Sequence, residues 1–218
     1  MQTILFIHFM ILSFIFGFLA AAIGVFPPGL INMTAAKISL VDGRLRALLF
    51  VLGAVIVIFF QTYIAVVFAN YINTHPEIII LFREIGLIIM FFATLYFLLF
   101  AKKQKLKNPN KIKIKSKKSR FFTGMVLSAI NVLPIPYYVL ITVTLASYNV
   151  FSFCATSIYS LVSGVVVGSF AVFYCYVVLF EKFKVKADYA LNNMNTILGT
   201  ITGIITLLSF FNVIKYYY

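Results

Sequence analysis

Two short segments combine helix-breaking residues with polar side chains inside long apolar runs. The first reads V-F-P-P-G-L-I-N, with Pro27, Pro28 and Gly29 followed by Asn32. Proline supplies no backbone N–H and clashes with the preceding turn, so a helix breaks there. In lipid the freed carbonyls and amides need other partners. Free amides at a helix N-terminus suit a carboxylate, whereas unpaired carbonyls suit an ammonium group or a cation.

The second segment, N-V-L-P-I-P-Y-Y, has a similar composition. Asn131 precedes Pro134 and Pro136, and Tyr137 and Tyr138 follow. The two segments therefore predict two broken helices whose inner ends meet near the membrane midplane.

The predicted geometry gives each break a positive and a negative side. The second half-helices begin after Gly29 and after Pro136, so we expect both N-termini near the midplane with free amides. The first half-helices end with carbonyls that we expect to be unpaired, at 24–26 and 131–133. An α-amino acid carries both of the groups that such a site would bind.

Polar side chains deep in an apolar chain need partners, so they add to the candidate site. Asn32 and Gln61 qualify, although each could instead bond a neighbouring helix, since such bonds are common. The prolines could likewise mark structural kinks alone. The predicted substrate-binding residues are Pro27, Pro28, Gly29, Asn32, Gln61, Asn131, Pro134, Pro136, Tyr137 and Tyr138.

One acidic residue is a candidate for coupling to protons or ions. Glu84 stands near the start of a predicted span, beside Arg83. Carboxylates inside membrane spans are usually functional, but we favour a solvated pair with Arg83 at the outer interface. No spacing of Cys and His predicts a metal site, and we expect no cofactor.

Membrane-spanning helices must position these residues. Hydrophobic residues make up 63% of the 218 and charged residues 11%, and the mean hydropathy is +1.06. These values are typical of polytopic membrane proteins, in which roughly 20 apolar residues cross the hydrocarbon. We predict an all-α fold of six spans, with a retained first span at about 4–40, then 47–69, 78–101, a fourth that starts at 121, 151–180 and 189–214.

The basic residues indicate orientation rather than a nucleic-acid interface. Ten of the eighteen lie in the loop 102–120, two at 41–46 and three at 181–188, and none at 70–77 or 147–150. The positive-inside rule places the basic loops in the cytoplasm. We predict a multi-pass protein of the bacterial plasma (inner) membrane with both termini outside, and no nucleic-acid partner.

The two halves of the chain show an internal repeat. A shift of 107 residues places Pro27 on Pro134, within six identities over fourteen positions, and a shift of 111 places Gly53 on Gly164. Three spans per half make the halves opposite in topology, as in inverted-repeat transporters. We predict two inverted three-helix repeats, 1–101 and 121–218, joined by the basic linker 102–120.

Glycines four residues apart occur twice in the second half. Gly164 with Gly168 and Gly199 with Gly203 have the small-xxx-small spacing, which lets helix backbones approach closely. We interpret both pairs as helix-packing positions.

Three stretches carry a family resemblance. They are F-P-P-G-L-I-N-M-T-A-A-K at 26–37, D-G-R-L-R-A-L-L-F-V-L-G-A at 42–54 and F-F-T-G-M-V-L-S-A-I-N-V-L-P-I-P-Y-Y at 121–138. With them the chain resembles the LysE-type family of amino-acid exporters over nearly its whole length. The resemblance implies a small secondary transporter that exports amino acids or related metabolites, is driven by a proton or ion gradient and associates as a homodimer.

Two features depart from the family pattern. Asn131 and Pro134 stand three residues apart where relatives usually have them adjacent, and no acidic residue follows the break at Pro27. The second departure bears on proton coupling and on the substrate. Without a carboxylate to hold a second ammonium group, we expect a neutral or weakly polar amino acid rather than lysine.

We therefore expect an exporter of small zwitterions that works by alternating access. The alternative is an ion channel or cation transporter that uses only the carbonyls of the broken helices, although no filter motif or ring of like charges is visible. A membrane-embedded enzyme is disfavoured because the two histidines, His8 and His75, lie near a span start and in an outer turn. An accessory protein that docks through its basic loop is a further alternative.

Overall fold

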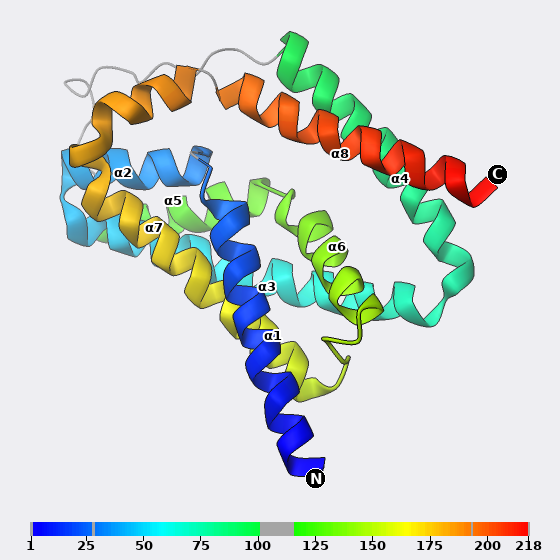
Figure 1. Cartoon of the computed structure of the whole chain (residues 1–218). Coiled ribbons are helices and arrows are strands. Elements are labelled where there is room, and N and C mark those ends of the chain that lie inside the picture. Colours follow the sequence, from blue (N-terminus) through cyan, green and yellow to red (C-terminus); the bar gives the residue numbers. More distant parts are fainter. Residues whose placement is uncertain (1, 28, 101–115, 193, 218) are drawn as a thin grey trace. The chain divides into compact units, whose positions relative to one another are not determined.

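A computed structural model describes residues 2–27, 29–100, 116–192 and 194–217 (Figure 1). Every regular element within these ranges is a helix, so the predicted all-α class is confirmed. Pro28 and most of the basic linker lie outside the described residues. In chain order the elements are α1 (Gln2–Val25), α2 (Leu30–Asp42), α3 (Arg44–Thr74), α4 (Pro76–Leu95), the π-helix η1 (Tyr96–Phe100), α5 (Lys117–Ile130), α6 (Pro134–Ser147), α7 (Ala155–Asn192) and α8 (Met194–Tyr217).

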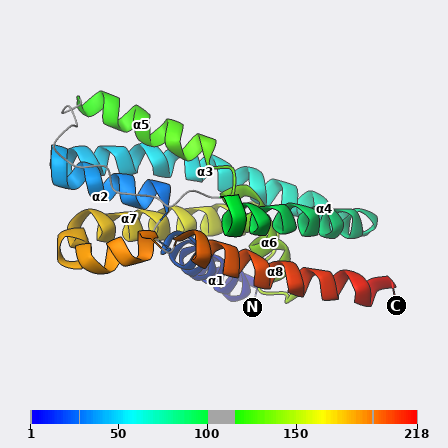
Figure 2. The same ribbon diagram turned by 90° about the horizontal axis from the view of Figure 1, so that it is seen from above.

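The helices form two compact units. One contains α1, α2, most of α3, α5, α6 and most of α7, and the other contains α4, η1 and α8. Within the second unit α8 lies beside α4 in both Figure 1 and Figure 2. A Cβ on Gly199 would overlap the Leu98 side chain, and one on Gly203 would lie 3.4 Å from Thr94 Cγ2. The predicted packing role is confirmed at Gly199, whereas Gly203 makes an ordinary van der Waals contact.

Both predicted helix breaks occur in the first unit. α1 and α2 meet at an angle of 76°, and α5 and α6 meet at 63°. α1 ends at Val25 and Gly29 is the N-cap of α2, because Pro27 cannot donate to a helical ladder. α6 begins at Pro134 and not after Pro136 as expected. Proline fits the first helical turn, where an N–H would have no intrahelical partner.

The lengths of the described helices agree with a membrane protein. α3 and the Ala155–Leu179 part of α7 are long and apolar enough to cross a bilayer. The number of such spans among the described residues rises from two to four if each bent helix pair is one span. The prediction of six spans stays a prediction.

Glycines bring the backbones of α1 and α7 into close contact. A Cβ on Gly17 would overlap the carbonyl oxygen of Leu161, and one on Gly164 would overlap that of Phe14. Gly168 approaches the α1 backbone in the same way one turn later. Small residues allow this approach in membranes, where packing rather than water exclusion holds helices together. The predicted packing role of Gly164 and Gly168 is confirmed.

The same contacts recur between α3 and α5. A Cβ on Gly124 would overlap the carbonyl oxygen of Phe50, and one on Gly53 would overlap that of Phe121. The shift of 107 residues relates α1 to α5, and the shift of 111 relates α3 to α7. Under these shifts the equivalent positions are Phe14 and Phe121, Gly17 and Gly124, Phe50 and Leu161, and Gly53 and Gly164. Each of these contacts in one helix pair therefore has a counterpart in the other.

Candidate functional site

Asn32 caps the first break from within the same broken helix. Its side chain is buried, and Nδ2 donates to the carbonyl oxygens of Val25 at 2.5 Å and Pro27 at 2.9 Å. The hydroxyl of Tyr176, on α7, donates to the carbonyl oxygen of Phe26 at 2.7 Å. Three consecutive carbonyls at the end of α1 thus have donors.

Gln61 caps the second break from a neighbouring helix, α3. Its buried Nε2 donates to the carbonyl oxygens of Ser128 at 3.1 Å and Asn131 at 2.9 Å. The opposite amide orientation would set an oxygen against two carbonyl oxygens, so the network itself assigns the two amide atoms. Both N–H groups of Gln61 are used at this break, as those of Asn32 are at the first.

These bonds contradict the expectation of unpaired carbonyls at 24–26 and 131–133. The carbonyls of Val25, Phe26 and Asn131 all accept bonds from side chains. The physical reason is that an unpaired carbonyl is costly where water cannot reach it, so the chain supplies side-chain donors. A ligand at the breaks would meet the oxygens of the two capping amides rather than bare carbonyls.

Only one of the two half-helix N-termini offers backbone donors. In α2 the first intrahelical bond joins Met33 N to Gly29 O, so the amides between them have no intrahelical acceptor. In α6 Pro134 and Pro136 carry no N–H, and the Ile135 amide already donates to a carbonyl of the break. The expected anion-binding amides are therefore available at α2 but not at positions 134–136.

Tyr137 connects the two breaks. Its hydroxyl, on α6, donates to the carbonyl oxygen of Ala20 in α1 at 2.8 Å. The ring lies against Gly24, where a Cβ would stand 2.8 Å from the ring carbon Cε1. Tyr138 is buried, and its ring meets that of Tyr137 edge to face with centroids 5.0 Å apart. The predicted residues of both breaks thus gather in one region of the first unit.

Four predicted residues do not join these side-chain contacts. Pro136 is exposed, and Asn131 contributes its main-chain carbonyl while its side chain forms no hydrogen bond among the described residues. Glu84 is half-buried on α4, in the second unit. Pro28 lies outside the described residues.

The sequence did not single out Tyr176 or Ser128. Tyr176 is one of 13 tyrosines, and both residues stand in the charge-free stretch 121–180. Nothing in the sequence distinguishes Ser128 from other helical serines, and only its hydrogen bond with Gln61 connects it to the second break. Only the packing of α3 on α5 and of α7 on α1 assigns them to the breaks.

Several buried side-chain oxygens in the first unit have no hydrogen-bond partner. Helical serines and threonines can bond the carbonyl four residues back, as Ser13 and Thr142 do here. A buried oxygen without a partner costs stability. The oxygens concerned are Asp42 Oδ1, Gln61 Oε1, Thr62 Oγ1, Ser128 Oγ and Ser169 Oγ.

A buried ion pair lies at the far end of α2. Asp42 Oδ2 contacts both Nε and Nη2 of Arg120 at 2.5 Å, and neither side chain is more than 8% exposed. Arg46, in the first turn of α3, donates from Nη1 to the Asp42 main-chain carbonyl at 2.8 Å. The ion pair ties α2 of the first broken helix to α5 of the second.

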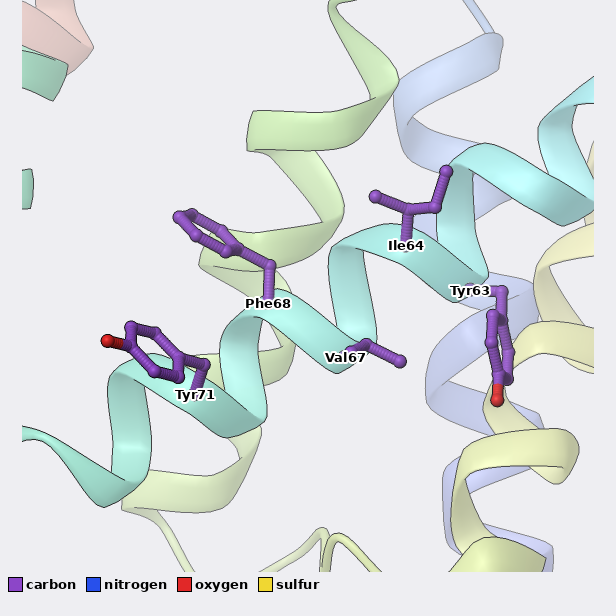
Figure 3. Close-up of a pocket in the computed structure, with 5 residues that line it drawn as sticks. All are labelled: Tyr63, Ile64, Val67, Phe68 and Tyr71. Atoms are coloured by element: carbon purple, nitrogen blue, oxygen red, sulfur yellow. The ribbon is translucent and has the colours of Figure 1, made fainter.

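An open groove occurs further along α3, at its outer surface (Figure 3). Its volume is about 430 Å³, and it is lined by Tyr63, Ile64, Val67, Phe68 and Tyr71. The Tyr63 ring stacks on that of Tyr159 from α7, with centroids 6.2 Å apart. The lining is apolar apart from tyrosine hydroxyls, so it suits lipid chains better than a zwitterion.

The family comparison covers both breaks. A family model described as LysE type translocator matches residues 22–211. The chain belongs to this family. LysE type translocators are transporters rather than enzymes, so the two breaks lie in a membrane transporter. No curated protein and no solved structure gives a significant match to this LysE-type chain.

Proposed function

We propose that this LysE-type translocator exports amino acids or similar small zwitterions across the plasma membrane by alternating access. The observation that carries the proposal is the bond from Tyr137, at the second break, to Ala20 in α1, the helix that ends at the first break. Broken helices in transporters bind substrates because their ends present charges away from lipid. Here α2 offers N–H donors for a carboxylate, and the capping amides offer oxygens for an ammonium group.

Equivalent glycine contacts support an inverted repeat as the framework for alternating access. α1 packs on α7 as α5 packs on α3, through positions that the internal shifts relate. Six spans with both termini outside would give the two helix pairs opposite orientations in the membrane. Transporters of this design open alternately to the two sides by rocking such halves around a fixed site.

The ion pair between Asp42 and Arg120 supports a closed cytoplasmic side in this conformation. It connects helices from different halves at the end of the molecule that carries Arg44 and Arg46. Buried charges are strongly held to their partners. Opening on this side would require α2 and α5 to separate, and the pair would then have to break.

The composition of the breaks favours a neutral substrate. No Asp or Glu occurs in 14–36, in α3 or in 121–150. A substrate with a second ammonium group would have no carboxylate there to neutralise it. We therefore place neutral or weakly polar amino acids ahead of lysine.

Efflux measurements test the proposal. Cells that express the protein are loaded with L-alanine, L-leucine, L-threonine or L-lysine, and release into the medium is compared with that from control cells. We expect faster release of one or more neutral amino acids, greater tolerance of their toxic analogues, and little effect on lysine. Unchanged release and tolerance, with the protein shown to be in the membrane, would contradict the proposal.

Cation conduction through the broken helices is less well supported. The carbonyls that it would use at Val25, Phe26 and Asn131 already accept hydrogen bonds. Electrical recording in planar bilayers would distinguish the two functions. Single-channel currents carried by Na⁺ or K⁺ in the absence of amino acids would favour a channel.

A further inference from the structure

We propose that the carboxamide oxygen of Gln61 and the hydroxyl oxygen of Ser128 accept the ammonium group of the substrate. This assignment rests on the proposed export function and names the atoms at which the amine binds. Both residues belong to the second break, Gln61 on α3 and Ser128 in the last turn of α5.

The Gln61 amide has a single consistent orientation, and that orientation leaves its oxygen free. Both N–H groups of Nε2 are occupied by the carbonyls of Ser128 and Asn131. Oε1 has no hydrogen-bond partner, although the residue is only 6% exposed. The cap of the helix break therefore also produces a buried acceptor.

The Ser128 hydroxyl is free although a local acceptor exists. Ser128 is 1% exposed and its Oγ has no partner. The carbonyl four residues back belongs to Gly124, and Ser128 does not bond it. Thr123, on the same helix, does use its own local acceptor, the Ser119 carbonyl, at 2.6 Å.

The two free oxygens belong to residues that are hydrogen-bonded to each other. The bond between Gln61 Nε2 and the Ser128 carbonyl, 3.1 Å long, holds the carboxamide beside the residue that carries the free hydroxyl. Each oxygen therefore lies on one of the two residues joined by this bond. Thr62 and Ser169 also have free buried hydroxyls, but neither makes a hydrogen bond to a carbonyl of the breaks.

The chemistry of the pair matches an ammonium group. An ammonium group has three donors and no acceptor, and a carboxamide oxygen is an acceptor only. The second lone pair of the Asn131 carbonyl, which accepts one bond from Gln61, supplies a third acceptor. A carboxylate would face oxygens of its own kind, and Ca²⁺ or Mg²⁺ would lack the carboxylate ligands that such cations prefer.

The burial of both oxygens places this step within the transport cycle. Neither oxygen is accessible from the surface in this conformation. The amine would reach them when the second break is open, and the present conformation corresponds to the closed one. The free oxygens then cost stability when the site is empty, and substrate would offset that cost.

The test compares alanine at Ser128 with matched control variants. Ser128→Ala removes the hydroxyl and leaves intact the main-chain carbonyl that Gln61 bonds. The controls, Thr62→Val and Ser169→Ala, remove buried hydroxyls that make no hydrogen bond to a carbonyl of either break. We expect all three variants to match or exceed the thermal stability of the wild type, because each deletes an unsatisfied polar group.

Efflux should separate the variants. We expect Ser128→Ala to release L-leucine and L-threonine about ten-fold more slowly than the wild type, with the two controls unchanged. N-acetyl-L-leucine, which lacks the ammonium group, should be released no faster by wild-type cells than by cells without the protein. If Ser128→Ala does not accumulate in the membrane, the isosteric Ser128→Cys, a weaker acceptor, replaces it.

Two outcomes would overturn the assignment. One is a Ser128 variant that exports as fast as the controls, and the other is accelerated export of N-acetyl-L-leucine by the wild type. Either result would leave the proposed export function standing. Failure of the wild type to export any amino acid would instead remove the proposed function itself.

Discussion

The two broken helices differ although their first halves are related in sequence. The first break is capped by Asn32 from its own helix, and α2 keeps backbone donors at its N-terminus. The second is capped by Gln61 from α3, and prolines leave α6 without such donors. At their far ends, α2 carries the buried Asp42, whereas α6 ends in uncharged residues.

In the proposed function, this difference would divide the binding of a zwitterion between the breaks. A carboxylate would find donors at the first break, and an ammonium group would find acceptors at the second. The caps also differ in how they respond to helix movement. The Asn32 cap lies within its own broken helix, whereas the Gln61 cap depends on the contact between α3 and α5. The two breaks thus differ chemically, as the asymmetric substrate of the proposed function would require.

Removing the first break should have the largest effect. Replacing Pro27 and Pro28 together with alanine restores two N–H donors and lets α1 continue into α2. We expect insertion into the membrane to persist and efflux of L-leucine to be abolished. Pro76→Ala is the control, because Pro76 begins α4 and fits its first turn. Efflux that survives the double substitution would make the break structural only.

Disrupting the charged end of α2 should cost the most stability. Asp42→Ala leaves the buried Arg120 without its partner, and such unpaired charges destabilise a protein by about 3–5 kcal/mol. The free energy of unfolding in detergent measures this loss. Ser147→Ala, at the exposed end of α6, is the matched control and should change it by less than about 0.5 kcal/mol. Equal losses in the two variants would mean that the two ends are energetically alike.

The two caps should differ in strength. Gln61→Leu leaves the Asn131 carbonyl without a donor and removes one of the two donors of the buried Ser128 carbonyl, which keeps the Asn131 amide. A buried polar group that loses its partner costs about 1–3 kcal/mol. Asn32→Leu removes a donor from the half-buried residues Val25 and Pro27 and breaks bonds only within one broken helix, whereas the Gln61 cap also joins α3 to the buried Ser128 of α5. We therefore expect a smaller loss for Asn32→Leu. Unfolding free energies of the two variants in the same detergent give the comparison. A larger loss for Asn32→Leu would reverse our ranking of the breaks.

Some of the differences between the two breaks can be predicted from the sequence, and others cannot. The breaks follow from proline in apolar runs, and the lack of donors at Pro134 and Pro136 could have been deduced, since proline has no N–H. The role of Gln61 could not, because it depends on which helix packs beside α5. Tyr176 and Ser128 are hidden for the same reason. The sequence divides into halves, whereas packing joins helices of both halves in each unit.

The smallest expected effect is on the reactivity of a cysteine in the segment between α6 and α7. Cys154 is exposed just before α7. Burial raises the pKa of its thiol. Hydrogen bonds with Ser152 and Ser157 act in the opposite direction and together have the larger effect, so the pKa is lowered to about 7. Because the thiolate is the reactive form, alkylation by an impermeant maleimide should rise about five-fold from pH 6 to pH 7 and about two-fold more above pH 7 before it levels off. The Cys154→Ser variant supplies the background.

The side of the membrane from which Cys154 is labelled tests the predicted orientation of the two broken helices. The loop at 147–150 lacks basic residues, so it is predicted to face outward, opposite to the basic loops. Spheroplasts should therefore be labelled at Cys154 without permeabilisation. Labelling that requires permeabilisation would invert the topology. The ion pair at Asp42 would then close the outer side of the transporter instead of the cytoplasmic side.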